Sequence, residues 1–132
     1  ADLPTSIVIV GGGAIGVEFA YLYHTYGVEV TVVELMPRLI PNEDEDISPI
    51  LERSFEKQGI NVMTGTGVMS VESSGNGLKV TVEKDGGSQA LEGEKVLVAI
   101  GVQGNIEELG LEDLGIEIEN SYIKVVRLRI PF

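Results

Sequence analysis

The stretch IVIVGGGAIGVEFA, which runs from Ile7 to Ala20, decides the fold of this 132-residue chain. Residues 7–10 are four β-branched residues without a polar break, a pattern typical of a strand buried on both faces. Residues 14–26 are expected to form a helix, because apolar residues recur there at helical spacing. The expected apolar stripe consists of Ile15, Phe19, Leu22 and Tyr26, and Gly27 is expected to end the helix.

Between the strand and the helix, Gly11, Gly13 and Gly16 fit the pattern G-x-G-x-x-G. A chain with 17 glycines can produce this spacing by chance, but its place between a strand and a helix favours a dinucleotide-binding turn. In such a turn the first glycine permits the tight bend, the second leaves room for the pyrophosphate, and the third lets the helix pack closely. The free N–H groups of the first helical turn then face the phosphates. The alternative is a strand-to-helix turn that binds nothing.

Glu34 ends a second expected strand, residues 28–34, and follows Gly16 by 18 residues. A carboxylate there can accept hydrogen bonds from the adenosine ribose and would repel a 2′-phosphate, which selects NAD over NADP. Arg38 could contact such a phosphate and ranks below Glu34 as a determinant. The remaining alternative is an ordinary acid at a strand end.

A second helix is expected from about Asp44 or Asp46 to Gln58, with Gly59 closing it. Its acidic start, residues 43–46, is interpreted as helix capping rather than as a metal site. Its buried face is expected to consist of Ile47, Ile50, Leu51, Ser54 and Phe55.

The rest of the chain changes from parallel to antiparallel patterning and back. Residues 60–63 predict a short third strand. Residues 66–72, 78–83 and 88–92 predict an antiparallel meander with one face exposed to solvent. Residues 95–100 return to the continuous apolar type of a buried parallel strand. We therefore expect an α/β fold: a Rossmann-like parallel sheet with helices on one side and a three-stranded antiparallel meander on the other.

Composition excludes several classes of function. Nine Lys and Arg residues and a net charge of −12 argue against nucleic-acid binding. No apolar run is long enough for a membrane span and no signal peptide precedes the first strand, so we expect a cytoplasmic location without membrane contact. The chain has no cysteine, which excludes disulfides, a zinc ribbon and thiol redox chemistry carried by this chain.

Several segments together resemble a known family. Leu3-Pro4 with SIVIVGGGAIGVEFA, and then VTVVELMPRLIP, EKQGINV, VLVAIG and LGLEDLGIEI, look like the NAD-binding domain of the dihydrolipoamide dehydrogenase family. That family belongs to the two-dinucleotide-binding flavoprotein disulfide oxidoreductases, whose fold is of the FAD/NAD(P)-binding type. The resemblance covers roughly residues 3–125 and includes the inserted meander.

The resemblance implies which residues line the NAD site: Gly11, Gly12, Gly13, Ala14, Ile15, Gly16, Val17, Glu18, Glu34, Val68 and Gly101. Glu18 would lie near the nicotinamide, facing the flavin of the parent enzyme, although the residues alone suggest a solvated helix position or an acid that complements the helix dipole. Val68 would contact the adenosine part, with core packing as the alternative, and Gly101 ends the last parallel strand. Two departures are residues 102–105, Val-Gln-Gly-Asn in place of the family's Arg-x-Pro-Asn, and residues 127–132, which match nothing expected.

The resemblance also implies what is missing. The parent would be a homodimer within a 2-oxo acid dehydrogenase complex, with an FAD domain that carries a redox-active cysteine pair and a dimerisation domain with a His–Glu pair. This chain would be one domain, residues 1–132, with a core over 3–103 and a segment, 104–132, that crosses back loosely toward the FAD domain. His24 is interpreted as a packing or surface residue, so no catalytic residue and no metal ligand is assigned.

We therefore expect an NAD(H)-binding domain that has no activity in isolation and that exposes docking surfaces, including Tyr21 or Tyr23. Three alternatives stay open. They are the NAD(H) domain of a related disulfide reductase or NADH oxidase, a non-catalytic NAD(H)-binding module, and an FAD-binding domain, which shares the glycine pattern.

Overall fold

The computed structural model describes residues 2–125, so residues 127–132 lie outside the described part. The chain divides after Gly101 into two compact units, which are described separately. Among the described residues, no helix combines the length and apolar character that crossing a membrane would require.

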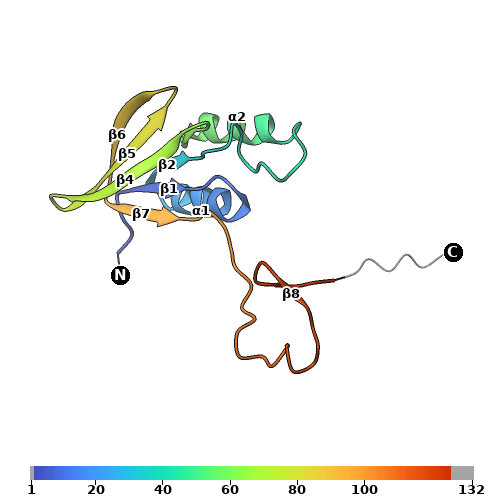
Figure 1. Cartoon of the computed structure of the whole chain (residues 1–132). Coiled ribbons are helices and arrows are strands. Elements are labelled where there is room, and N and C mark those ends of the chain that lie inside the picture. Colours follow the sequence, from blue (N-terminus) through green and yellow to red (C-terminus); the bar gives the residue numbers. More distant parts are fainter. Residues whose placement is uncertain (1, 126–132) are drawn as a thin grey trace. The chain divides into compact units, whose positions relative to one another are not determined.

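The first unit is built on a four-stranded parallel sheet in the order β3-β2-β1-β7 (Figure 1). Its strands are β1 (Ser6–Val10), β2 (Glu29–Val33), β3 (Asn61–Met63) and β7 (Lys95–Val98). Ile9 pairs with Val32 on one side and with Leu97 on the other, so β1 is central. The glycines follow β1 directly, which places the turn at the carboxyl edge of the sheet.

An antiparallel meander of β4 (Gly67–Ser74), β5 (Gly77–Lys84) and β6 (Gly87–Gly93) packs on one face of this sheet. Alternate residues of β1 face opposite sides: Val8 packs with Val80 and Val82 of the meander. Ile7 and Ile9 pack with the helices in a separate core. The predicted fold class is therefore confirmed, with helices on one face and the meander on the other.

Helix α1 (Ala14–Thr25) buries a different face from the one predicted. Gly16 and Ala20 are its buried residues, whereas Phe19 is 37% and Tyr26 63% exposed. The reason is close packing, because a Cβ on Gly16 would collide with the carbonyl oxygen of Gly11. The closest approach to β1 is therefore at Gly16, and the predicted stripe of larger apolar residues is exposed.

Helix α2 (Ser48–Gln58) starts later than either predicted position, Asp44 or Asp46, and is closed as predicted by Gly59, whose φ is +92°. The prediction of acidic capping is wrong, because the N-cap is Ile47 and no side-chain hydrogen bond caps the helix. The acidic residues form turns ahead of it, where the Asp46 N–H donates to the Asp44 carboxylate at 3.0 Å.

The expected buried face of α2 is only partly right. Phe55 is buried and Leu51 is half-buried, but Ile47 and Ile50 are 48% and 61% exposed. Ser48 is buried instead, because its hydroxyl is engaged by the loop before the helix.

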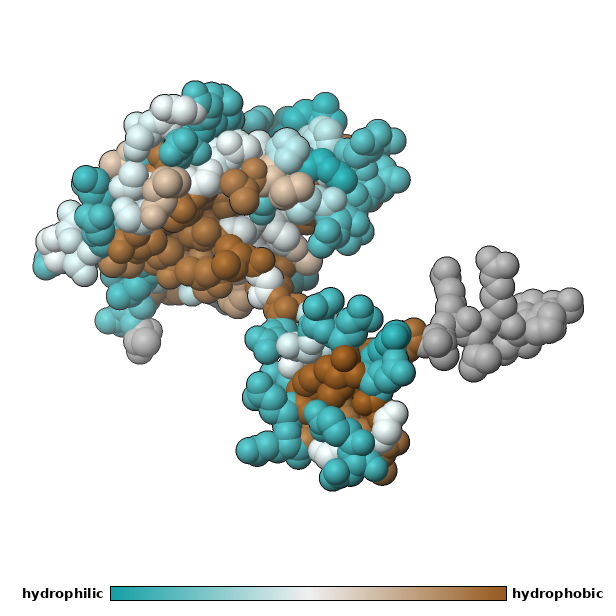
Figure 2. Space-filling view, viewed as in Figure 1, coloured by the Kyte–Doolittle hydropathy of each residue, from teal (hydrophilic) through white to brown (hydrophobic). Residues whose placement is uncertain are grey.

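Strand β7 is an edge strand rather than the buried strand predicted from its apolar run, since no described strand pairs with its outer side. It ends at Val98, which is 63% exposed, and Ile100 is 77% exposed. Figure 2 shows apolar side chains gathered on the face of the unit that carries β7 in Figure 1.

The second unit, from Val102 onward, contains a two-stranded antiparallel hairpin of β8 (Ile118–Glu119) and β9 (Tyr122–Ile123). Residues 107–109 form a turn. The Tyr122 hydroxyl donates to the carbonyl of Val102 at 2.9 Å, and Lys124 pairs with Glu117 at 2.9 Å.

Candidate functional site

Two glycines of the turn are required by the approach of other backbone. Gly11 has a φ of +109°, and a Cβ there would strike the carbonyl oxygen of Ala99, just after β7. A Cβ on Gly16 would strike Gly11 itself. These contacts bring the carboxyl ends of β1 and β7 and the start of α1 together at one point.

Gly12 and Gly13 differ from each other in their surroundings. A Cβ on Gly12 would lie 2.6 Å from the Leu39 side chain, whereas a Cβ on Gly13 would meet nothing within 4 Å. Gly13 is the N-cap of α1 and makes no side-chain capping bond. The turn therefore opens to its surroundings at Gly13, as a pyrophosphate site requires.

The first turn of α1 has N–H groups free for a ligand. The first backbone bond of the helix runs from the Val17 N–H to the Gly13 carbonyl at 3.0 Å. The N–H groups of Ala14, Ile15 and Gly16 precede that bond and have no partner within the helix. Together with the helix dipole, they make this end of α1 suitable for an anion.

Glu34 follows β2 directly and is 8% exposed. Its Oε2 accepts the Gly12 N–H at 2.5 Å and its Oε1 accepts the Met36 N–H at 2.7 Å. The carboxylate is therefore oriented by backbone N–H groups of the glycine turn and of the chain after β2, a structural role that the sequence pattern does not predict. A carboxylate oxygen accepts more than one hydrogen bond, so both retain capacity for ribose hydroxyls.

Arg38 is held within the protein. Its Nη1 donates to the Ser48 hydroxyl at 3.1 Å, and its Nη2 donates to the Pro41 carbonyl at 2.9 Å. These bonds hold the guanidinium against the loop and α2, so Arg38 would have to leave both partners to turn toward a 2′-phosphate.

The other predicted site residues differ in how much of each is exposed to solvent. Val17 is half-buried against the helix-side core, and Glu18 is exposed on α1. Val68 is half-buried in β4 against the meander-side core. Gly101 is exposed, shortly after the end of β7. The glycine turn and Glu34 thus form one connected group, and Val68 has a packing role of its own.

A small cavity of about 70 Å³ adjoins the turn. Gly13 and Ala14 line one side, and residues 40–43 line the other. Sequence reasoning missed these loop residues, because nothing in their composition indicates that the loop folds back onto the glycines.

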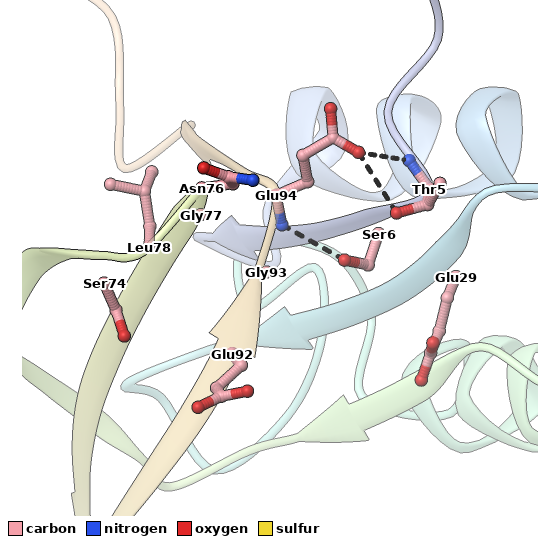
Figure 3. Close-up of a pocket in the computed structure, with 10 residues that line it drawn as sticks. All are labelled: Thr5, Ser6, Glu29, Ser74, Asn76, Gly77, Leu78, Glu92, Gly93 and Glu94. Carbon is pink, nitrogen blue, oxygen red and sulfur yellow. Dashed lines mark hydrogen bonds between the residues drawn. The ribbon is translucent and has the colours of Figure 1, made fainter.

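A larger open cavity of about 660 Å³ lies at the opposite, amino edge of the sheet (Figure 3). Thr5, Ser6 and Glu29 line it beside Glu92 and Glu94. Ligands of open α/β sheets bind outside the carboxyl ends of the strands, so this cavity is not the candidate dinucleotide site.

Beside this amino-edge cavity, Glu94, which precedes β7, is hydrogen-bonded to Thr5 and Ser6 at the start of β1, as the dashed lines in Figure 3 show. Its carboxylate accepts the Thr5 N–H at 2.8 Å and the Thr5 hydroxyl at 3.1 Å. These two hydrogen bonds lower the pKa of Glu94 below its ordinary value, because both favour the ionised form.

Comparison with known proteins gives a consistent result. The family model described as "Pyridine nucleotide-disulphide oxidoreductase" matches residues 1–127. The chain is 49% identical over 117 residues to a dihydrolipoyl dehydrogenase of Mycobacterium leprae, which covers 89% of this chain and 25% of that protein. It is 44% identical over 126 residues to the dihydrolipoyl dehydrogenase of Bacillus subtilis, covering 94% of this chain and 27% of that protein.

Solved structures agree. LpdA from Mycobacterium tuberculosis superposes with a TM-score of 0.77 at 37% identity, covering 96% of this chain and 27% of that one. The HOCl-induced flavoprotein disulfide reductase RclA from Escherichia coli gives 0.77 at 30% identity, covering 95% and 28%. The chain thus spans about a quarter of the length of these relatives.

Proposed function

The chain belongs to the pyridine nucleotide-disulphide oxidoreductase family, and from that premise we propose that it is the NAD(H)-binding domain of a dihydrolipoamide dehydrogenase. The parent would oxidise dihydrolipoamide through a disulfide and FAD and then reduce NAD⁺. Its homodimeric state, its place in a 2-oxo acid dehydrogenase complex and its cytoplasmic location are parts of the same proposal.

One observation carries the binding of a dinucleotide: the glycine turn is closed at Gly12 and open at Gly13, beside a carboxylate held in place by the turn itself. The pyrophosphate would lie over Gly13, against the free N–H groups that begin α1. The ribose hydroxyls would donate to Glu34, whose negative charge disfavours a 2′-phosphate.

The choice of NAD over FAD rests on two further features. Glu18 is exposed on α1, one turn beyond the open end of the glycine turn, as expected of a residue that faces the nicotinamide and a flavin. The meander and the GGGxxGxE sequence are the pattern of the family's NAD domain. Val68 and Gly101 belong to the proposed site as its adenosine-side and nicotinamide-side borders.

The chemistry itself would belong to the cofactors. The nicotinamide supplies hydride transfer when bound, and this chain would contribute binding and orientation. An NAD(H) domain of another disulfide reductase or of an NADH oxidase would use the same residues, since the substrate site lies outside this chain.

The test is a separate titration of the 132-residue chain with NADH, NADPH and FAD, repeated with Gly13→Ala. We expect NADH to bind more tightly than NADPH and FAD. Because an added Cβ at Gly13 touches no protein atom, the variant should fold, yet bind NADH at least about tenfold more weakly. A calorimetric titration measures the affinity, and thermal unfolding checks the fold.

Gly87→Ala is the matched control, since its Cβ would meet only a carbonyl oxygen at 3.4 Å in the meander. Its NADH affinity should equal that of the wild type. Tight FAD binding without NADH binding would overturn the NAD assignment, and Gly13→Ala binding like Gly87→Ala would overturn the proposed site.

A further inference from the structure

The loop between β2 and α2 folds back onto the glycine turn, and side chains of α2 hold it there by hydrogen bonds. We propose that Arg38, Ser48 and Glu52 are positioning residues that hold residues 38–43 against Gly12, and that this segment is the outer wall of the dinucleotide site. The inference rests on the proposed function for its ligand, and on the structure alone for the attachment.

Helix α2 holds the loop from one side. The Ser48 hydroxyl, which is buried, donates to the Leu39 carbonyl at 2.7 Å and accepts from Arg38. The Glu52 carboxylate accepts the Leu39 N–H at 3.0 Å. Both backbone groups of Leu39 are thus bonded to side chains from the first half of α2.

Arg38 adds a bond within the loop itself. Its guanidinium joins Ser48 of the helix to the Pro41 carbonyl, so the chain on both sides of Ile40 is fixed. A planar guanidinium suits this task, because it presents two donors in fixed directions.

The loop in turn contacts the glycine turn. The Ile40 N–H donates to the Gly12 carbonyl at 2.7 Å, and the Leu39 side chain is fully buried against Gly12. Ile40 has a φ of +44°, which is costly for a β-branched residue and persists only where the surroundings impose it. The bonds from α2 to Leu39 and the bond from Arg38 to Pro41 supply that constraint on either side of Ile40.

The geometry therefore links α2 to the ligand site through the loop. Residues 40–43 face Gly13 and Ala14 across the small cavity at the start of α1. If a bond to α2 is lost, the loop spends more time away from the turn, and apparent affinity falls with the populated fraction of the competent form.

The test compares Glu52→Leu, Glu52→Gln and Glu56→Leu in the 132-residue chain. Glu52→Leu removes the acceptor for the Leu39 N–H, whereas Glu52→Gln keeps an oxygen there and removes only the charge. Glu56→Leu is the matched control, because Glu56 is an exposed carboxylate on the same helix.

Two measurements are made on each variant. Amide hydrogen exchange at Ile40, measured without ligand, reports how often the loop leaves Gly12. NADH titration reports whether the loop contributes to dinucleotide binding. We expect Glu52→Leu to speed Ile40 exchange by about tenfold and to weaken NADH binding by about five- to tenfold. The amides of β1 and β2 should be unchanged in Glu52→Leu, and the other two variants should match the wild type.

Unchanged Ile40 exchange in Glu52→Leu would overturn the positioning role of Glu52. Faster exchange with unchanged NADH affinity would overturn the proposal that residues 38–43 form the outer wall of the dinucleotide site. If the wild type itself binds no NADH, the proposed function fails while the exchange data still decide the attachment. Should Glu52→Leu not fold, Arg38→Lys replaces it. A single ammonium cannot reproduce both guanidinium bonds, so Ile40 exchange should rise there too, and unchanged exchange would overturn the proposal.

Discussion

Glu34 has a structural role that is separate from the ligand contact proposed for it. Its two oxygens accept backbone N–H groups from Gly12 and Met36, so the carboxylate joins the glycine turn to the chain after β2. A fall in NADH affinity in a Glu34 variant would therefore report the shape of the turn as well as the loss of a ribose contact.

Glu34→Ala is predicted to lower the free energy of unfolding by about 2–4 kcal/mol, because it leaves two N–H groups without their acceptor. Urea denaturation measures this loss. Glu29→Ala is the control, since Glu29 is an exposed glutamate in β2, and it should cost less than about 0.5 kcal/mol. Equal losses in the two variants would show that the Glu34 bonds do not stabilise the fold.

At the scale of single elements, both helices bury less apolar surface than their sequences suggest. In α1 only Gly16 and Ala20 are fully buried, and in α2 the polar Ser48 is buried near the start of the helix. Helical spacing identifies a helix, but the partner surface selects the face that is buried.

The two faces of α2 should respond differently to truncation. Phe55→Ala is predicted to cost about 3–4 kcal/mol, because Phe55 is 3% exposed in the helix-side core. Ile50→Ala should cost less than about 0.5 kcal/mol, because that side chain is 61% exposed. Chemical denaturation of both variants checks this, and a comparable loss in Ile50→Ala would mean that α2 buries the face predicted from its sequence.

At the scale of the whole molecule, the residues before Gly101 contain both hydrophobic cores. Among residues 2–125, no member of either core lies beyond Leu97. Exposed apolar residues lie in α1 and β7 and just after them: Phe19, Tyr21, Leu22, Tyr26, Val98 and Ile100. We expect such residues to dock against the rest of a longer chain, since the relatives are about four times as long as this chain. That docking role, like the loose attachment of residues 104–132, stays a prediction.

A chain that ends at Gly101 is predicted to unfold cooperatively, with a free energy within about 1 kcal/mol of the 132-residue chain. A chain that ends at Gly93 is the comparison, because it lacks β7 and the Leu97 packing and should not fold stably. Circular dichroism during urea unfolding measures both. Loss of structure in the longer truncation would show that the second unit completes the fold.

The sequence by itself determined the features that depend on neighbouring residues. β-branched runs specified β1 and β2, glycines specified the turn and both helix ends, and alternation specified the meander. The glycine pattern and Glu34 were identified as one candidate site for the same reason, since their spacing along a βαβ unit is a local property.

Only the tertiary structure decided what depends on surfaces meeting across the chain. It selected the buried faces of the helices and left β7 at an edge. It also engaged Arg38 with Ser48 and brought Ile40 to Gly12. These outcomes follow from backbone approach and from the need of buried polar groups for partners, neither of which periodicity or composition contains.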